Sequence, residues 1–90
     1  MISLLVHYSG HVQGVGFRYS VKQLATGFEV TGSVRNLPDG RVELHAQGER
    51  AEVEAFLAAI RESQLRHYIH EEKQEFVPRN AQATGFQIAL

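Results

Sequence analysis

Three glycines fall within seven positions, from Gly10 to Gly16, and this segment is the part of the sequence best suited to chemistry. It follows an apolar run and precedes a helical pattern that begins near Arg18. Successive backbone N–H groups in such a loop can converge on an anion, and a helix N-terminus adds about half a positive charge. Gly14 and Gly16 let the backbone approach a ligand, and the Arg18 guanidinium matches phosphate or carboxylate. The segment therefore predicts a site for a small anion.

The same spacing also fits a tight strand-to-helix turn beside a solvated Arg18, and composition alone does not separate the two interpretations. Two other phosphate-binding motifs are excluded. A P-loop requires a Lys-Ser/Thr pair after its second glycine, and none follows here. A dinucleotide-binding fingerprint requires Gly or Ala where Tyr19 stands.

Changes of hydrophobic period predict the elements that must position this loop. We expect strands over residues 2–8, 28–36, 41–48 and 85–90, an imperfect strand within 67–77, helices over 17–27 and 49–61, a turn at 37–40 and a loop over 78–84. The last strand carries Phe86, Ile88 and Leu90 on one side. This β-α-β-β-α-β order predicts an α+β, ferredoxin-like sandwich with a mostly antiparallel sheet and two helices on one face.

The composition limits the function classes. Ninety residues, without a repeat or linker, predict a single domain spanning 1–90. Nine Lys and Arg against ten Asp and Glu give a net charge of −1, which disfavours a nucleic-acid binder. The absence of cysteine excludes disulfides, thiolate nucleophiles and cysteine-ligated metals. The N-terminus carries no signal or membrane-span pattern, so we expect a cytoplasmic protein without membrane partners.

Two segments resemble the signatures of the acylphosphatase family. The first is GHVQGVGFR, residues 10–18, and the second is GSVRNLPDGRV, residues 32–42, closing at Gly48. They stand at the family's usual separation, and the resemblance covers residues 1–60 well. The sequence departs at Ser33, where the family commonly has an aromatic residue, and at Gly16, where Tyr or Phe is frequent. The segment 63–76 also lacks the family's usual pattern.

The resemblance implies hydrolysis of the carboxyl–phosphate bond of small-molecule acyl phosphates to a carboxylate and inorganic phosphate. It places phosphoryl binding on the arginine and on the loop backbone, which here are Gln13, Gly14, Val15, Gly16, Phe17 and Arg18. It assigns the orientation of the attacking water to Asn36. A metal-free monomeric enzyme without a cofactor is implied, with inorganic phosphate and other small anions as further ligands.

This chemistry is plausible for so sparse a site. A carboxylate is a good leaving group, so little general-acid help is needed. Phosphoryl transfer depends mostly on positioning and charge stabilisation, which amides and one arginine provide. Asn36 also fits a simple turn residue before Leu-Pro-Asp-Gly. Strand parity places Asn36 on the same side as Val34, so a turn position and a water-orienting role are compatible.

The remaining polar and aromatic residues predict no second site. His67 and His70 lie three apart, but a solvated face is expected there rather than a metal site. His11 is expected to be an exposed loop histidine. Tyr19 and Tyr68 are predicted to be packing residues rather than nucleophiles.

Two other functions fit parts of the pattern. The anion loop fits a module that binds phosphate without hydrolysing it. The element order also fits an RNA-binding sheet, but the strand face that would be exposed offers Glu43 and His45 rather than an aromatic pair. Domains that resemble this one also form one end of larger maturation proteins, although the length here favours a free-standing chain.

Overall fold

The computed structural model describes residues 1–89, so the apolar position predicted at Leu90 lies outside the described residues. The elements in order are β1 (Ile2–Gly10), α1 (Phe17–Ala25), β2 (Val30–Asn36), β3 (Val42–Gly48), α2 (Arg50–Glu62), a 3₁₀ turn η1 (Gln64–His67), β4 (Ile69–Phe76) and β5 (Phe86–Ile88). The ferredoxin-like order is confirmed, with a fifth strand in the segment where the pattern was weakest.

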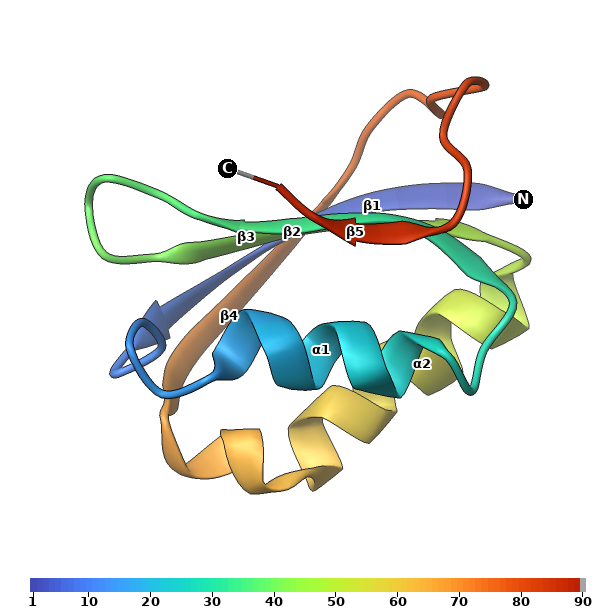
Figure 1. Cartoon of the computed structure of the whole chain (residues 1–90). Coiled ribbons are helices and arrows are strands. Elements are labelled where there is room, and N and C mark those ends of the chain that lie inside the picture. The colour runs from blue at the N-terminus through green and yellow to red at the C-terminus, as the bar shows by residue number, and fades with distance from the viewer. Residues whose placement is uncertain (90) are drawn as a thin grey trace.

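The five strands form one sheet in the order β4-β1-β3-β2-β5. The three pairings β4-β1, β1-β3 and β3-β2 are antiparallel, and β5 runs parallel to β2. Both helices lie under the same face of the sheet (Figure 1). The sheet is therefore mostly antiparallel, as the sequence predicts, and β1 lies in its interior.

The core lies between the sheet and the helices. Alternate residues of β1 and β3 point into it, including the fully buried Val6 and Leu44, and these two face each other in the β1-β3 register. Phe56 of α2 packs between Phe28 and Phe86, at ring-centroid distances of 5.8 and 5.5 Å. Burial of these apolar side chains is the main stabilising term and holds α1 against β2 and β5.

The segment after α2 explains why its sequence pattern is weak. Ser63 caps η1 by accepting a hydrogen bond from the Leu65 amide at 3.1 Å. Strand β4 is an edge strand; most of its side chains are exposed, and half of them are charged. Such an edge needs no apolar alternation, and its charges discourage pairing with another chain. Its Glu72 pairs with Arg61 of α2 at 3.1 Å, which ties the edge to the helix layer.

Several predicted boundaries are shifted by one to two residues, and the starts of β2 and α2 have a clear physical reason. Strand β2 begins at Val30 rather than at residue 28, because the Phe28 amide still donates to Ala25 of the helix end at 3.1 Å. Helix α2 begins at Arg50 because Glu49 is extended and serves as the N-cap. No helix among residues 1–89 is long and apolar enough to cross a membrane.

Candidate active site

A cavity of about 200 Å³ lies where the β1–α1 loop, the first turn of α1 and the ends of β2 and β5 meet. Its walls are Val12, Gly14, Gly16, Phe17, Arg18, Tyr19, Asn36 and Ile88. The fold thus brings Arg18, from the first signature, and Asn36, from the second, to the same cavity. The remainder of the site is mostly backbone.

The loop amides form the donor side of this cavity. Within residues 1–89, no amide from Gln13 to Arg18 donates a hydrogen bond to any acceptor of the chain. Gly14 and Gly16 have φ of 82° and 79°, a backbone conformation that other residues adopt only with strain. Gly16 is also the N-cap of α1, and no side chain satisfies the first amides of that helix. Unsatisfied donors at a helix N-terminus are an arrangement that favours an anion.

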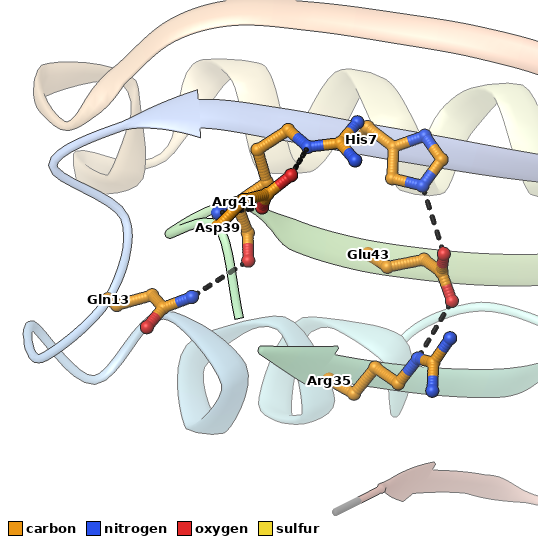
Figure 2. Close-up of polar contacts among 6 residues, drawn as sticks. All are labelled: His7, Gln13, Arg35, Asp39, Arg41 and Glu43. Carbon is orange, nitrogen blue, oxygen red and sulfur yellow. Dashed lines mark hydrogen bonds and ion pairs between the residues drawn. The ribbon is translucent and has the colours of Figure 1, made fainter. Parts of the chain in front are cut away.

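Contacts of three residues, His11, Gln13 and Phe17, hold the loop in place. The His11 amide donates to the Tyr68 carbonyl at 2.9 Å, and buried Phe17 packs on Tyr8 at a centroid distance of 5.2 Å. The carboxamide of Gln13 donates to the carbonyl oxygens of Leu37 and Arg41, at 2.8 and 2.9 Å. Figure 2 shows Gln13 reaching from the loop to the hairpin at Arg41. The loop is therefore joined to the strand end that carries Asn36.

Arg18 supplies positive charge beside these amides. It is half-buried on the first turn of α1, and its guanidinium has no hydrogen bond or ion pair within the described chain. Arg35 and Arg41, in contrast, pair with Glu43 and Asp39 at 2.9 and 2.8 Å. The guanidinium of Arg18 is thus free for an anion in the cavity.

Asn36 supplies an acceptor on the opposite wall. Its backbone pairs with Val42 in the hairpin, and its side-chain Oδ1 is buried without a hydrogen-bond partner among residues 1–89. An unsatisfied buried acceptor costs about 1–3 kcal/mol, so a donor that enters the cavity is stabilised there. The parity expected from the sequence is found, because Asn36 follows buried Val34 on the helix-facing side.

Four further residues differ in how their observed positions compare with the sequence predictions. The side chains of Gln13 and Val15 point away from the cavity, toward the hairpin and toward a neighbouring groove. The prediction that Tyr19 is a packing residue is wrong: it is 63% exposed at the cavity mouth. The sequence predicts Ile88 as a strand residue but gives no signal that it lines the cavity, because that depends on the parallel pairing of Val34 with Ile88.

The opposite face of the sheet is polar. Glu43 accepts from His7 and Arg35, both at 2.9 Å (Figure 2). Burial tends to raise the pKa of Glu43, but the hydrogen bonds from His7 and Arg35 outweigh it and the pKa is lowered. His45 bonds to Ser3 Oγ at 2.7 Å, and burial lowers its pKa. These polar side chains on the central strands are not the aromatic pair that an RNA-binding sheet uses.

The residues that could hold a metal are dispersed. No group of three or more His, Asp or Glu side chains in metal-binding proximity occurs in the part of the chain that the structure describes. His67 lies in η1 and His70 in β4, and both are exposed. The donor set of the cavity itself, amides and a guanidinium, is suited to anions.

Comparison with known proteins agrees with this geometry. The sequence model of the acylphosphatase family matches residues 4–88. An acylphosphatase from Archaeoglobus fulgidus is 48% identical over 61 residues, which are 68% of each chain. One from Methanospirillum hungatei is 51% identical over 59 residues, 66% of this chain and 63% of that protein. The crystal structure of acylphosphatase from Bacillus subtilis superposes with a TM-score of 0.89 at 29% identity, and all of both chains is covered.

Proposed function

Because this chain belongs to the acylphosphatase family and is a hydrolase of acyl phosphates, we propose that the cavity between the β1–α1 loop and Asn36 is where the reaction occurs. The observation that carries the proposal is that one cavity is lined by loop residues with unpaired amides, by Arg18 with an unpaired guanidinium and by Asn36 with a buried, unpaired carboxamide oxygen, all among residues 1–89. Each of these groups matches one requirement of phosphoryl transfer.

The loop holds the phosphoryl group. The amides of residues 13–18 and the Arg18 guanidinium donate hydrogen bonds to its oxygens, where negative charge is spread in the transition state. The positive φ of Gly14 and Gly16 keeps these amides oriented before the substrate arrives, so little reorganisation is needed. Among the described residues that line this cavity, Arg18 is the only charged one.

Asn36 positions the nucleophile. Its Oδ1 accepts a hydrogen bond from a water molecule, which then attacks phosphorus opposite the acyl oxygen. The bond from the water oxygen to phosphorus forms while the bond from phosphorus to the acyl oxygen breaks. The electron pair leaves with the carboxylate, and the water protons remain on the released phosphate. A carboxylate of low pKa needs no protonation to leave, so no general acid is required.

The same donor set supports a reaction without a metal or cofactor. The amides and Arg18 supply the charge stabilisation that Mg²⁺ provides in many phosphoryl transferases. We also propose that the protein acts as a cytoplasmic monomer whose ligands are small-molecule acyl phosphates, inorganic phosphate and other small anions, with no nucleic-acid or membrane partner. Light scattering tests the monomeric state, and cell fractionation tests the cytoplasmic location.

Phosphate release from acetyl phosphate and benzoyl phosphate tests the function. Wild-type protein is expected to release phosphate from both, at a rate that EDTA does not change. Arg18→Ala and Asn36→Ala are each expected to lower kcat by about 10²–10³, the usual effect of removing one preorganised group. Arg50→Ala is the matched control, because Arg50 lies in an exposed ion pair with Glu54 on α2. Phosphate binding without turnover by the wild type would support a binding module instead.

A further inference from the structure

A second groove, of about 360 Å³, lies next to the phosphate cavity. Its walls include Val15, Tyr19, Ser20, Leu24, Leu65 and Tyr68, and we call it the tyrosine groove. One side is α1 and the other is the segment from Ser63 to Tyr68, around η1. The mechanism described above assigns no role to this groove.

The tyrosine groove adjoins the phosphate cavity. Tyr19 lines both of them. Val15 lines the groove, while its neighbours Gly14 and Gly16 line the cavity. The loop that would hold the phosphoryl group is thus the border between the two spaces. A substituent on a bound phosphoryl group therefore needs to extend past only one residue to enter the groove.

The groove lies on the other side of α1 from Asn36. Asn36 and Ile88 reach the cavity from the sheet, against which α1 packs. The groove is closed by the η1 segment, which lies below α1 in Figure 1, away from the sheet. In an in-line displacement the nucleophile and the leaving group take opposite sides of phosphorus. If the attacking water is held at Asn36, the acyl group must lie on the opposite side of phosphorus, which is the side that faces the groove.

The walls of the groove indicate which acyl groups fit it. Among the described residues that line it, none is charged; Ser20, Gln23, Ser63 and Gln64 are polar and uncharged, and the others are apolar or aromatic. Leu65 is buried, whereas Tyr19 and Tyr68 are 63% and 38% exposed and have ring surface available for contact. Uncharged walls with exposed aromatic rings favour an apolar or aromatic group and do not compensate the desolvation of a second carboxylate.

We propose that the tyrosine groove binds the acyl group of the substrate and selects apolar, above all aromatic, acyl phosphates over small or charged ones. This inference rests on the proposed function of the adjacent cavity. Tyr68 and Tyr19 contact the acyl group, and Val15 guides it out of the phosphate cavity.

The test compares kcat/KM for benzoyl phosphate with kcat/KM for acetyl phosphate, whose methyl group is too short to reach the far wall. Tyr68→Ala is expected to lower the benzoyl value by about three- to tenfold, the usual effect of one aromatic contact, and to leave the acetyl value unchanged. Ser20→Phe, which fills the groove from α1, is expected to have the same selective effect. Phe76→Ala is the control, because Phe76 is 67% exposed on β4 and outside the groove.

An unchanged ratio of the two values in both variants would overturn the inference, as would an equal fall for both substrates. If wild-type protein hydrolysed neither substrate, the proposed function would fail, and binding would still test the groove. Calorimetry would then compare phenylphosphonate with methylphosphonate. A phenyl preference that is reduced in Ser20→Phe supports the groove, and equal affinities refute it.

Discussion

The carboxamide of Gln13 lies 2.9 Å from the carbonyl oxygen of Arg41, and this contact joins the phosphate-side loop to the hairpin that carries Asn36 (Figure 2). The same nitrogen donates to Leu37 at 2.8 Å. One side chain therefore spans the turn between the two strands and aligns the two halves of the candidate site. Gln13 contributes to the site through this position rather than by pointing into the cavity.

Replacing Gln13 by alanine should lower both stability and activity. Two hydrogen bonds are lost, but Leu37 and Arg41 each keep a backbone partner for the carbonyl, so we expect a loss of about 1–2 kcal/mol in the free energy of unfolding. A loop displaced from Asn36 should lower kcat/KM by about ten- to hundredfold. Urea denaturation and phosphate release measure the two effects. Gln74→Ala, at an exposed site on β4, should change neither, and unchanged activity in Gln13→Ala would refute the positioning role.

Replacing Asn36 by alanine should separate activity from stability. Its side chain makes no hydrogen bond to the described chain, so the free energy of unfolding should change by less than about 1 kcal/mol. The loss of about 10²–10³ should fall on kcat, with KM little changed, because the role proposed for the side chain is to orient water rather than substrate. Thermal denaturation and steady-state kinetics together check this. A large rise in KM at constant kcat would instead assign Asn36 to substrate binding.

Gly16→Ala should destabilise the protein through backbone strain alone. An added Cβ meets no atom within 4 Å, but φ is 79°, so the expected cost is about 1–2 kcal/mol. Activity should fall too, because the first amides of α1 would turn away from the cavity. Gly27→Ala is the matched control, since its nearest contact, the Leu24 carbonyl oxygen at 3.6 Å, is ordinary and its φ is not in the positive range. Equal stability of the two variants, measured by urea denaturation, would contradict this account of Gly16.

Stability should fall in mild acid because of His45. Burial lowers its pKa below the ordinary 6.5, so the unfolded chain takes up this proton at a higher pH than the folded protein does. Neutral His45 contributes fully to the free energy of unfolding above pH 6.5. This contribution declines as the pH falls below that value, and the free energy stops changing on this account once the pH is below the pKa of His45 in the folded protein. His45→Gln keeps a partner for Ser3 but does not titrate. Its stability should therefore depend less on pH as the pH falls below about 6.5, and an identical pH dependence would refute the assignment.

Much of the fold can be predicted because its signals are local. The alternation in β3 and the three- and four-residue spacing in α1 are read within a few positions, and both elements occur where expected. The density of glycines in this short segment also makes Gly14 and Gly16 recognisable as loop residues. Edge strand β4 is less clear, because a strand with one neighbour and one exposed side needs little apolar pattern.

By itself, the sequence determined the order of the elements, the donor-rich loop before α1, and the presence of an arginine and an asparagine in two separated motifs. Only the tertiary structure decided that Arg18 and Asn36 line one cavity, that Ile88 completes its wall, and that Tyr19 stands exposed between two adjoining spaces. The physical reason is that residues distant in the chain meet only through strand pairing and helix packing. These depend on how the whole molecule buries its apolar surface, not on the spacing of neighbouring residues.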